Sequence, residues 1–141
     1  MLNIYTSPNP EDIVTTSNQI ISAHDLSLGS WNTMKLYVRN SDNTKYYTNV
    51  EIRLDIESNP TENGNVYLLR KGNVEPTAIE WGNTELLTEI EMEATIGSEE
   101  EANTESYFPF FLRVYIPADA SIGFSTECNL IIVAIQEPVS I

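Results

Sequence analysis

Apolar and polar residues alternate at every second position through most of this chain. The clearest run covers residues 50–57, in which Val50, Ile52, Leu54 and Ile56 alternate with Glu51, Arg53, Asp55 and Glu57. Such alternation is typical of an antiparallel strand with one buried and one solvated face. Residues 32–40 repeat it, with Met34, Leu36 and Val38 opposite Lys35, Tyr37 and Arg39. We predict two strands joined into a hairpin by the polar turn at 40–45.

A third strand is predicted at residues 107–116, with the sequence YFPFFLRVYI. One face is apolar throughout and should lie in the core: Phe108, Phe110, Leu112, Val114 and Ile116. The other face mixes polar-tipped and apolar groups: Tyr107, Pro109, Phe111, Arg113 and Tyr115. Phe111 is the surplus apolar residue of this outer face. We expect it to lie under the acidic loop at 98–106 or against a partner.

The last strand is apolar on both faces, with the sequence LIIVAI at residues 130–135. We expect it to lie near a sheet edge, in a hairpin with residues 110–116. A long apolar edge left bare invites aggregation. Ile131, Val133 and Ile135 should therefore be covered by the N-terminal arm, by another layer of the chain or by a partner subunit. Together with Phe111, they are the candidate interface residues.

The remaining segments complete an all-β pattern. Pro76 and Gly82 interrupt residues 73–97, and although 84–94 could be scored as a helix, alternation favours strands there, so no helix is expected. About 7–8 strands with regular turn signals predict an immunoglobulin-like antiparallel β-sandwich, with a jelly roll or small barrel as the alternative. We assign residues 1–25 to an N-terminal arm or first strand and residues 26–141 to the sandwich domain.

The charge balance narrows the range of partners. Seven Lys and Arg against 21 Asp and Glu give a net charge of −14. Such a surface repels phosphate backbones and anionic lipid, so neither nucleic acid nor membrane is an expected partner. The N-terminal residues lack the basic and apolar regions of a signal peptide, which predicts that the protein is made in a cytoplasm and not exported by that route.

No residue pattern indicates catalysis, and we expect neither a cofactor nor a metal. His24 is the only histidine and is expected to be a surface residue beside Asp25, while Cys128 is expected to be a small buried apolar group. The acids at 41–43 and 98–101 lack the spaced ligands of a calcium loop. Trp31 and Trp81 are expected to pack in the core. The alternative is a sugar-stacking platform formed by these two residues with Tyr46 and Tyr47.

Three segments resemble the small immunoglobulin-like virion proteins of tailed bacteriophages. They are WNTMKLYVRNSDNTKYYTNVEIRL at 31–54, GNVEPTAIEWGN at 72–83 and SYFPFFLRVYIPADAS at 106–121. The resemblance extends over about residues 31–135, and its most specific part is Tyr-Phe-Pro-Phe followed by Arg-Val and a proline turn.

The resemblance implies a non-enzymatic structural component of a virion. The first expectation is a capsid decoration or cement protein that binds the major capsid protein or other virion proteins, and a tail or neck component is the next. A homo-oligomer is left open. The alternative from a different class is a glycan-binding or adhesive module, which requires a groove with exposed Trp or Tyr.

Overall fold

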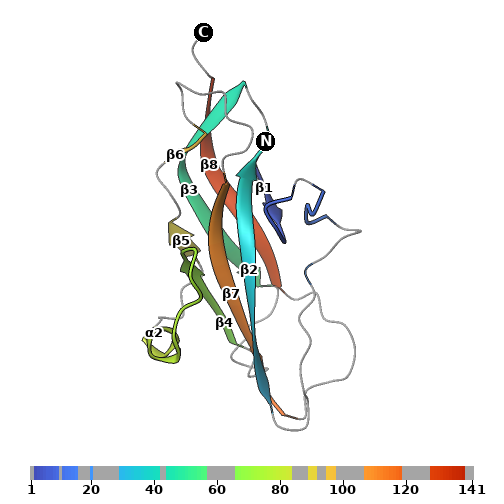
Figure 1. The fold of residues 1–141 in the computed structure, drawn as a ribbon, viewed down its shortest axis with the longest axis vertical. Helices are drawn as coiled ribbons and strands as arrows, with labels where there is room; N and C mark the ends of the chain where they lie inside the picture. The colour runs from blue at the N-terminus through green and yellow to red at the C-terminus, as the bar shows by residue number, and fades with distance from the viewer. Residues whose placement is uncertain are drawn as a thin grey trace.

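The computed structural model describes residues 2–9, 11–15, 20, 29–41, 44–56, 66–83, 89–91, 95–97, 107–118 and 128–138, and structural statements below refer to these (Figure 1). The strands are β1 (Leu2–Tyr5), β2 (Ser30–Asn40), β3 (Lys45–Ile56), β4 (Val66–Lys71), β5 (Glu89–Glu91), β6 (Thr95–Ile96), β7 (Tyr107–Ile116) and β8 (Cys128–Pro138). One short helix, α2 (Ala78–Gly82), lies between β4 and β5.

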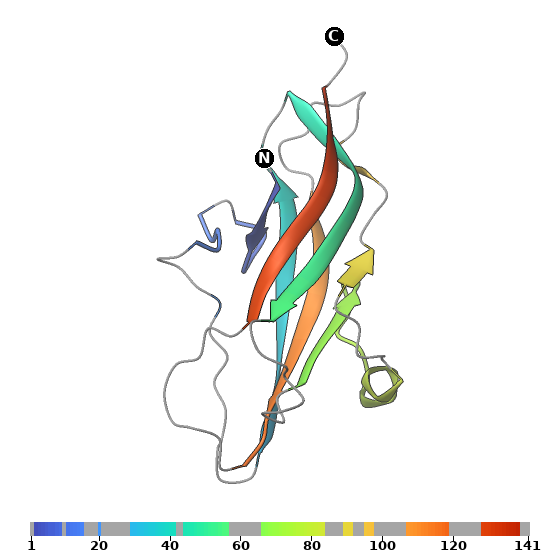
Figure 2. The ribbon, with the colours of Figure 1, turned by 180° about the vertical axis from the view of Figure 1, so that it is seen from behind.

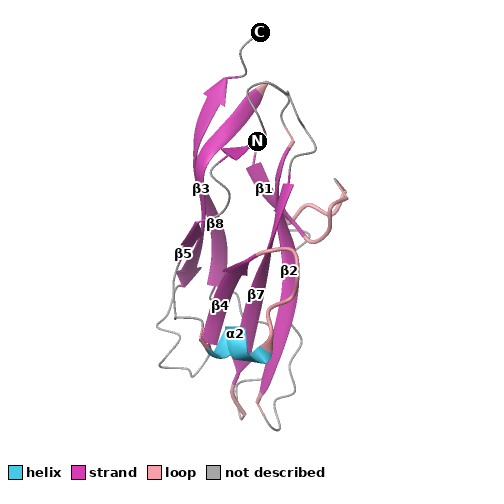
Figure 3. Ribbon diagram, turned by 60° about the vertical axis from the view of Figure 1, so that its left-hand side comes forward, coloured by secondary structure: helices cyan, strands magenta, loops and turns pink. Residues whose placement is uncertain are grey.

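The strands form two antiparallel sheets packed as a sandwich, seen as two layers in Figure 3. The first sheet has the order β1-β2-β7-β4. In the second sheet, β3 pairs with β8 on one side and with the short strands β5 and β6 on the other. The expected all-β antiparallel sandwich is therefore confirmed.

Alternation predicted the buried faces of the long strands correctly. The inner faces of β2, β3 and β7 meet in one core cluster, whose most buried members are Leu36, Val38, Val50, Ile52, Ile96 and Phe110. Full burial of a side chain of this size stabilises the fold by roughly 1.5–3 kcal/mol. The core therefore comes from apolar residues that recur at every second position on strands of both sheets.

Both predicted hairpins are wrong. Strand β2 pairs with β1 and β7, and β3 belongs to the other sheet. Likewise, β8 pairs with β3 and not with β7. The inner faces of β2 and β3 both contribute to the core cluster, so these strands pack face to face instead of edge to edge. At the crossing between the sheets, the buried Asn40 donates a hydrogen bond from Nδ2 to the Lys45 carbonyl at 2.9 Å.

A bulge keeps β3 in register with the core. The pairing with β8 shifts between Thr48 and Glu51, and Asn49 has a φ of 52°. Asn tolerates this left-handed conformation better than most residues. The extra residue lets Tyr47 and Val50, three positions apart, both be buried.

The strand order does not establish the immunoglobulin-like arrangement. That arrangement places the last two strands side by side in one sheet, whereas β7 and β8 lie in different sheets. From β2 to β5, successive strands alternate between the two sheets, and so do β6, β7 and β8.

Helix α2 was not expected, because five residues are too few to show helical periodicity. A local signal does mark it. Thr77 and Glu80 form a capping box, in which each side chain accepts a hydrogen bond from the other residue's backbone N–H. Pro76 precedes the cap.

Candidate protein interface

Strand β8 carries a row of exposed apolar side chains on its outer face. Ile131 is 41 % exposed, Val133 37 % and Ile135 49 %. We call these three residues the β8 row. The residues between them, Ile132 and Ala134, face inward and pack against the core. The row is therefore the outward half of a strand that is apolar on both faces.

The same strand has an open edge. Among the described strands, β3 alone pairs with it, with Ile131 opposite Arg53 and Val133 opposite Glu51. Among the described residues, no backbone hydrogen bond joins β8 to any segment other than β3. Figure 2 shows β8 at the margin of its sheet, outside β3. An edge of this kind offers alternate N–H and C=O groups to another strand.

Charge is absent from the centre of β8. Residues 130–136 contain no ionisable side chain in a chain that has 28 Lys, Arg, Asp and Glu residues, from the counts of 7 and 21. The nearest described charges on the outer face are those of Arg53 and Glu51, which bind each other at 2.9 Å. A strand that docks on β8 therefore meets an apolar, uncharged surface.

Phe111, the fourth candidate, is not exposed. It is 4 % exposed and packs with Leu68 of β4 and Trp81 of α2. We expected cover from the acidic loop or a partner, and the described cover is Trp81 of the same chain. The loop at 98–106 lies outside the described residues. Phe111 is thus a core residue of a second, smaller cluster, and we remove it from the candidate interface.

One cation, Arg113, stacks on both tryptophan rings at the outer face of the first sheet. The Arg113 guanidinium lies 4.6 Å from the centre of the Trp31 ring and 5.6 Å from that of Trp81. Its buried Nε has no hydrogen-bond partner in the described part of the chain. Contacts of this type contribute roughly 0.5–2 kcal/mol, more where water is excluded.

Two further cations fasten neighbouring segments to the same face. Lys35 Nζ donates to the Asn73 carbonyl at 2.9 Å and to its Oδ1 at 2.7 Å. Arg39 is 7 % exposed and donates from Nη1 to the Pro8 carbonyl at 2.8 Å. The N-terminal segment and the segment before α2 are therefore both tied to β2.

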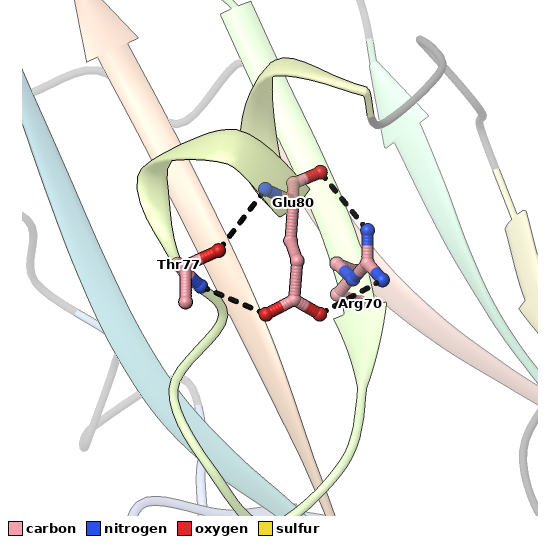
Figure 4. Close-up of polar contacts among 3 residues, drawn as sticks. All are labelled: Arg70, Thr77 and Glu80. Carbon is pink, nitrogen blue, oxygen red and sulfur yellow. Dashed lines mark hydrogen bonds and ion pairs between the residues drawn. The ribbon is translucent and has the colours of Figure 1, made fainter.

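Helix α2 is anchored through Glu80, as Figure 4 shows. The Thr77 backbone N–H donates to Glu80 Oε1 at 3.2 Å, and Arg70 of β4 donates to the Glu80 carbonyl at 3.0 Å. The Thr77 backbone N–H, followed by the Thr77 side chain and the charge of Arg70, lowers the pKa of Glu80 below its usual value. This carboxylate has a structural role.

The two tryptophans differ. Trp81 is 4 % exposed and packs as expected, whereas Trp31 is 43 % exposed, so its expected burial is wrong. The Trp31 ring lies 5.0 Å from that of Tyr115 and is tilted by 41°. Of the four residues of the suggested sugar platform, Trp31 is exposed, Tyr46 is partly buried, and Trp81 and Tyr47 are buried.

The other exposed large apolar residues of the described chain lie on separate elements. They are Trp31 on β2, Tyr107 on β7, Ile79 on α2 and Val74 in the loop before it. The β8 row alone places three such side chains at alternate positions of one strand. Alternation and a bare edge singled out these residues in the sequence, and the structure places all three on one open surface.

Several residues considered above lie outside the described part: His24, the acids at 98–101, and the side chain of Cys128. Within the described part, no group of three or more His, Cys, Asp or Glu could hold a metal ion. No described helix is long and apolar enough to span a membrane.

Comparison of the chain with protein-family models, with curated proteins and with solved structures gave no match.

Proposed function

We propose that this protein is a non-enzymatic structural subunit that binds other proteins through strand β8. The observation that carries the proposal is the β8 row on an open strand edge. Addition of a strand at such an edge supplies main-chain hydrogen bonds, and the outward side chains supply specificity. Natural sheets generally blunt edges with charge, proline or a covering segment, and residues 130–136 have neither charge nor proline.

The setting we propose is the virion of a tailed bacteriophage, with the protein as a capsid decoration or cement subunit. A tail or neck position is the alternative within that setting. Support comes from the resemblance of residues 31–135 to small virion proteins, from the net charge of −14, and from the edge of β8 that no described strand pairs with. The partner is then the major capsid protein or another virion protein, and the protein is made in the host cytoplasm.

The test combines gene context with binding. If neighbouring genes encode capsid, portal or tail proteins, the chain is co-expressed with them and assembled particles are sedimented. We expect the chain to sediment with the particles. The double variant Ile131→Asp/Val133→Lys should abolish this association. It keeps the net charge unchanged, and places each new charge opposite an unlike one on β3, Arg53 or Glu51.

The matched control is Ile79→Asp/Val74→Lys, which introduces the same residue types at positions 78 % and 82 % exposed, far from β8 in sequence. This control should still sediment with the particles. Equal binding by both double variants would contradict the assignment of β8, and no binding to any particle component would contradict the virion setting.

Glycan binding is the second candidate function, favoured by the exposed Trp31 ring, which lies against the partly buried Tyr115 and the Arg113 guanidinium. Exposed aromatic rings of this kind can stack on sugar rings. Binding on a glycan array that is lost with Trp31→Ala and kept with Ile131→Asp/Val133→Lys would favour this function over assembly through β8.

A further inference from the structure

We infer that the strand that pairs with β8 is β8 of a second copy, in an antiparallel pair whose two-fold axis passes through Val133. This inference rests on the proposed function only in using β8 as the assembly strand. It assigns the edge of β8 to a second copy and fixes the register, so that a virion protein would bind the outward side chains of the β8 row on the paired strands and not the strand edge itself.

A second copy of the chain can close both β8 edges at once. An antiparallel pair formed by two identical edges is isologous, so both edges are used up and the assembly closes as a dimer. The two edges of the first sheet are less available. Tyr5 of β1 bridges to Ile13, and β4 ends in the cations Arg70 and Lys71, beside α2. Strand β8 offers eleven residues, of which residues 130–136 carry no charge.

The sequence of β8 is self-complementary about Val133. With the axis there, Ile131 lies opposite Ile135 of the partner copy and Val133 lies opposite Val133. Each residue of the β8 row then meets an apolar residue across the pair, where opposed side chains are about 4.5–5.5 Å apart. The last charged position of the strand, Glu137, falls opposite Asn129, so no like charges meet.

Neighbouring registers are worse. Pairing must keep outer-face residues opposite outer-face residues, so the register can change only in steps of two. An axis at Ala134 places Ile131 opposite Glu137. An axis at Ile132 places Ile135 opposite Asn129. Only the axis at Val133 pairs the whole row with itself.

The salt dependence of binding distinguishes a second copy from a cationic partner protein. Each copy carries −14, so two copies repel at long range while their contact surfaces are neutral. Salt screens this repulsion. The dimer should therefore tighten as salt concentration rises, whereas a cationic partner protein would bind more weakly.

The register is tested by charge exchange at position 133, with sedimentation velocity of the full chain over a range of concentrations. The unaltered chain should form dimers. Val133→Lys and Val133→Glu should each weaken dimerisation roughly tenfold or more, because like charges meet across the axis. A mixture of the two variants should form heterodimers. The control pair, Val74→Lys and Val74→Glu, should dimerise as the unaltered chain does.

A cysteine variant gives a second readout. In a Cys128→Ser background, Val133→Cys should form a disulfide-linked dimer under mild oxidation, because opposed Cβ atoms lie close to disulfide distance. Ile131→Cys should not, since its two copies would be about 14 Å apart, four residues at about 3.4 Å each.

Three results would overturn the inference: a chain that is monomeric at all concentrations, a dimer unaffected by Val133→Lys, or a mixture of the Lys and Glu variants that stays monomeric. If the chain is monomeric yet sediments with particles through β8, the second copy is wrong as the partner while the proposed function stands. If the chain dimerises through β8 but binds no particle component, the second copy stands as the partner while the proposed function is wrong.

Discussion

Around Phe111, the outer face of the first sheet is covered by a segment of the same chain, whereas the outer face of β8 carries three apolar side chains that no described residue covers. On the first sheet, Phe111 is buried beneath Trp81. On the second sheet, the β8 row is 37–49 % exposed. Both sheets thus carry large apolar side chains on an outer face, near the middle of a strand.

Charge separates the two faces further. Five of the seven basic residues of the chain lie on the first sheet: Lys35, Arg39, Arg70, Lys71 and Arg113. Three of these reach out to hold a covering segment, at Pro8, Asn73 and Glu80. Strand β8 has no basic residue. Cations of the first sheet therefore bind segments of the same chain, whereas β8 has no cation that could do so.

Removal of the cover is expected to have the largest effect on the fold. Trp81→Ala deletes the buried ring that packs on Phe111 and stacks on Arg113, at a cost of about 3–5 kcal/mol in the free energy of unfolding. Urea unfolding followed by circular dichroism measures it. Trp31→Ala, with a ring that is 43 % exposed, should cost clearly less. Equal losses for both variants would mean that Trp81 does not close this face.

Loss of the helix cap should have a smaller effect. Thr77→Ala removes the side chain that accepts from the Glu80 backbone N–H at 3.2 Å, and a lost cap of this type costs about 1 kcal/mol. Thr77→Ser is the matched control, because it keeps the hydroxyl. If the serine variant is destabilised as much as the alanine variant, the hydroxyl is not what holds α2.

Acid should remove the part of this stability that depends on Glu80. Because the folded state lowers the pKa of Glu80, its contribution is full above the unfolded pKa and is lost as the pH falls through the folded value. The difference in stability between the unaltered chain and Glu80→Gln should be seen at pH 7 and shrink below about pH 4.5. A difference that is constant from pH 7 to pH 3 would contradict this.

Charges placed on the β8 row should have the smallest effect on the fold. We expect Ile131→Asp/Val133→Lys to change the monomer's unfolding free energy by no more than about 0.5 kcal/mol per site, as for surface substitutions in general. Association should nevertheless be lost. Urea unfolding at low protein concentration separates the two effects, and a loss comparable to that of Trp81→Ala would show that the row supports the fold itself.

Sequence alone predicted which residues are buried better than it predicted which strands are neighbours. Alternation placed Leu36, Val50 and Phe110 in the core because burial depends on a local period of two. Both hairpins failed because the same period results whether two strands pair at their edges or pack across a sandwich. Pairing is fixed by the whole set of strands, which one strand's pattern does not contain.

The candidate interface was likewise predictable from the sequence only in part. The β8 row could be found in the sequence, because an apolar strand without charge at its centre stands out in an acidic chain. The burial of Phe111 could not, since its cover comes from Trp81, 30 residues earlier, on a helix of one turn. The capping box of Thr77 and Glu80 was the available signal for that helix.

Hydrogen exchange of the backbone amides, measured by NMR on dilute and on concentrated protein, tests most directly whether β8 is the assembly strand. We predict that alternate amides within residues 130–136 become protected as the protein associates, while the amides of β4 at 66–71 exchange at the same rate in both samples. Protection that appears on β4 and not on β8 would contradict the account.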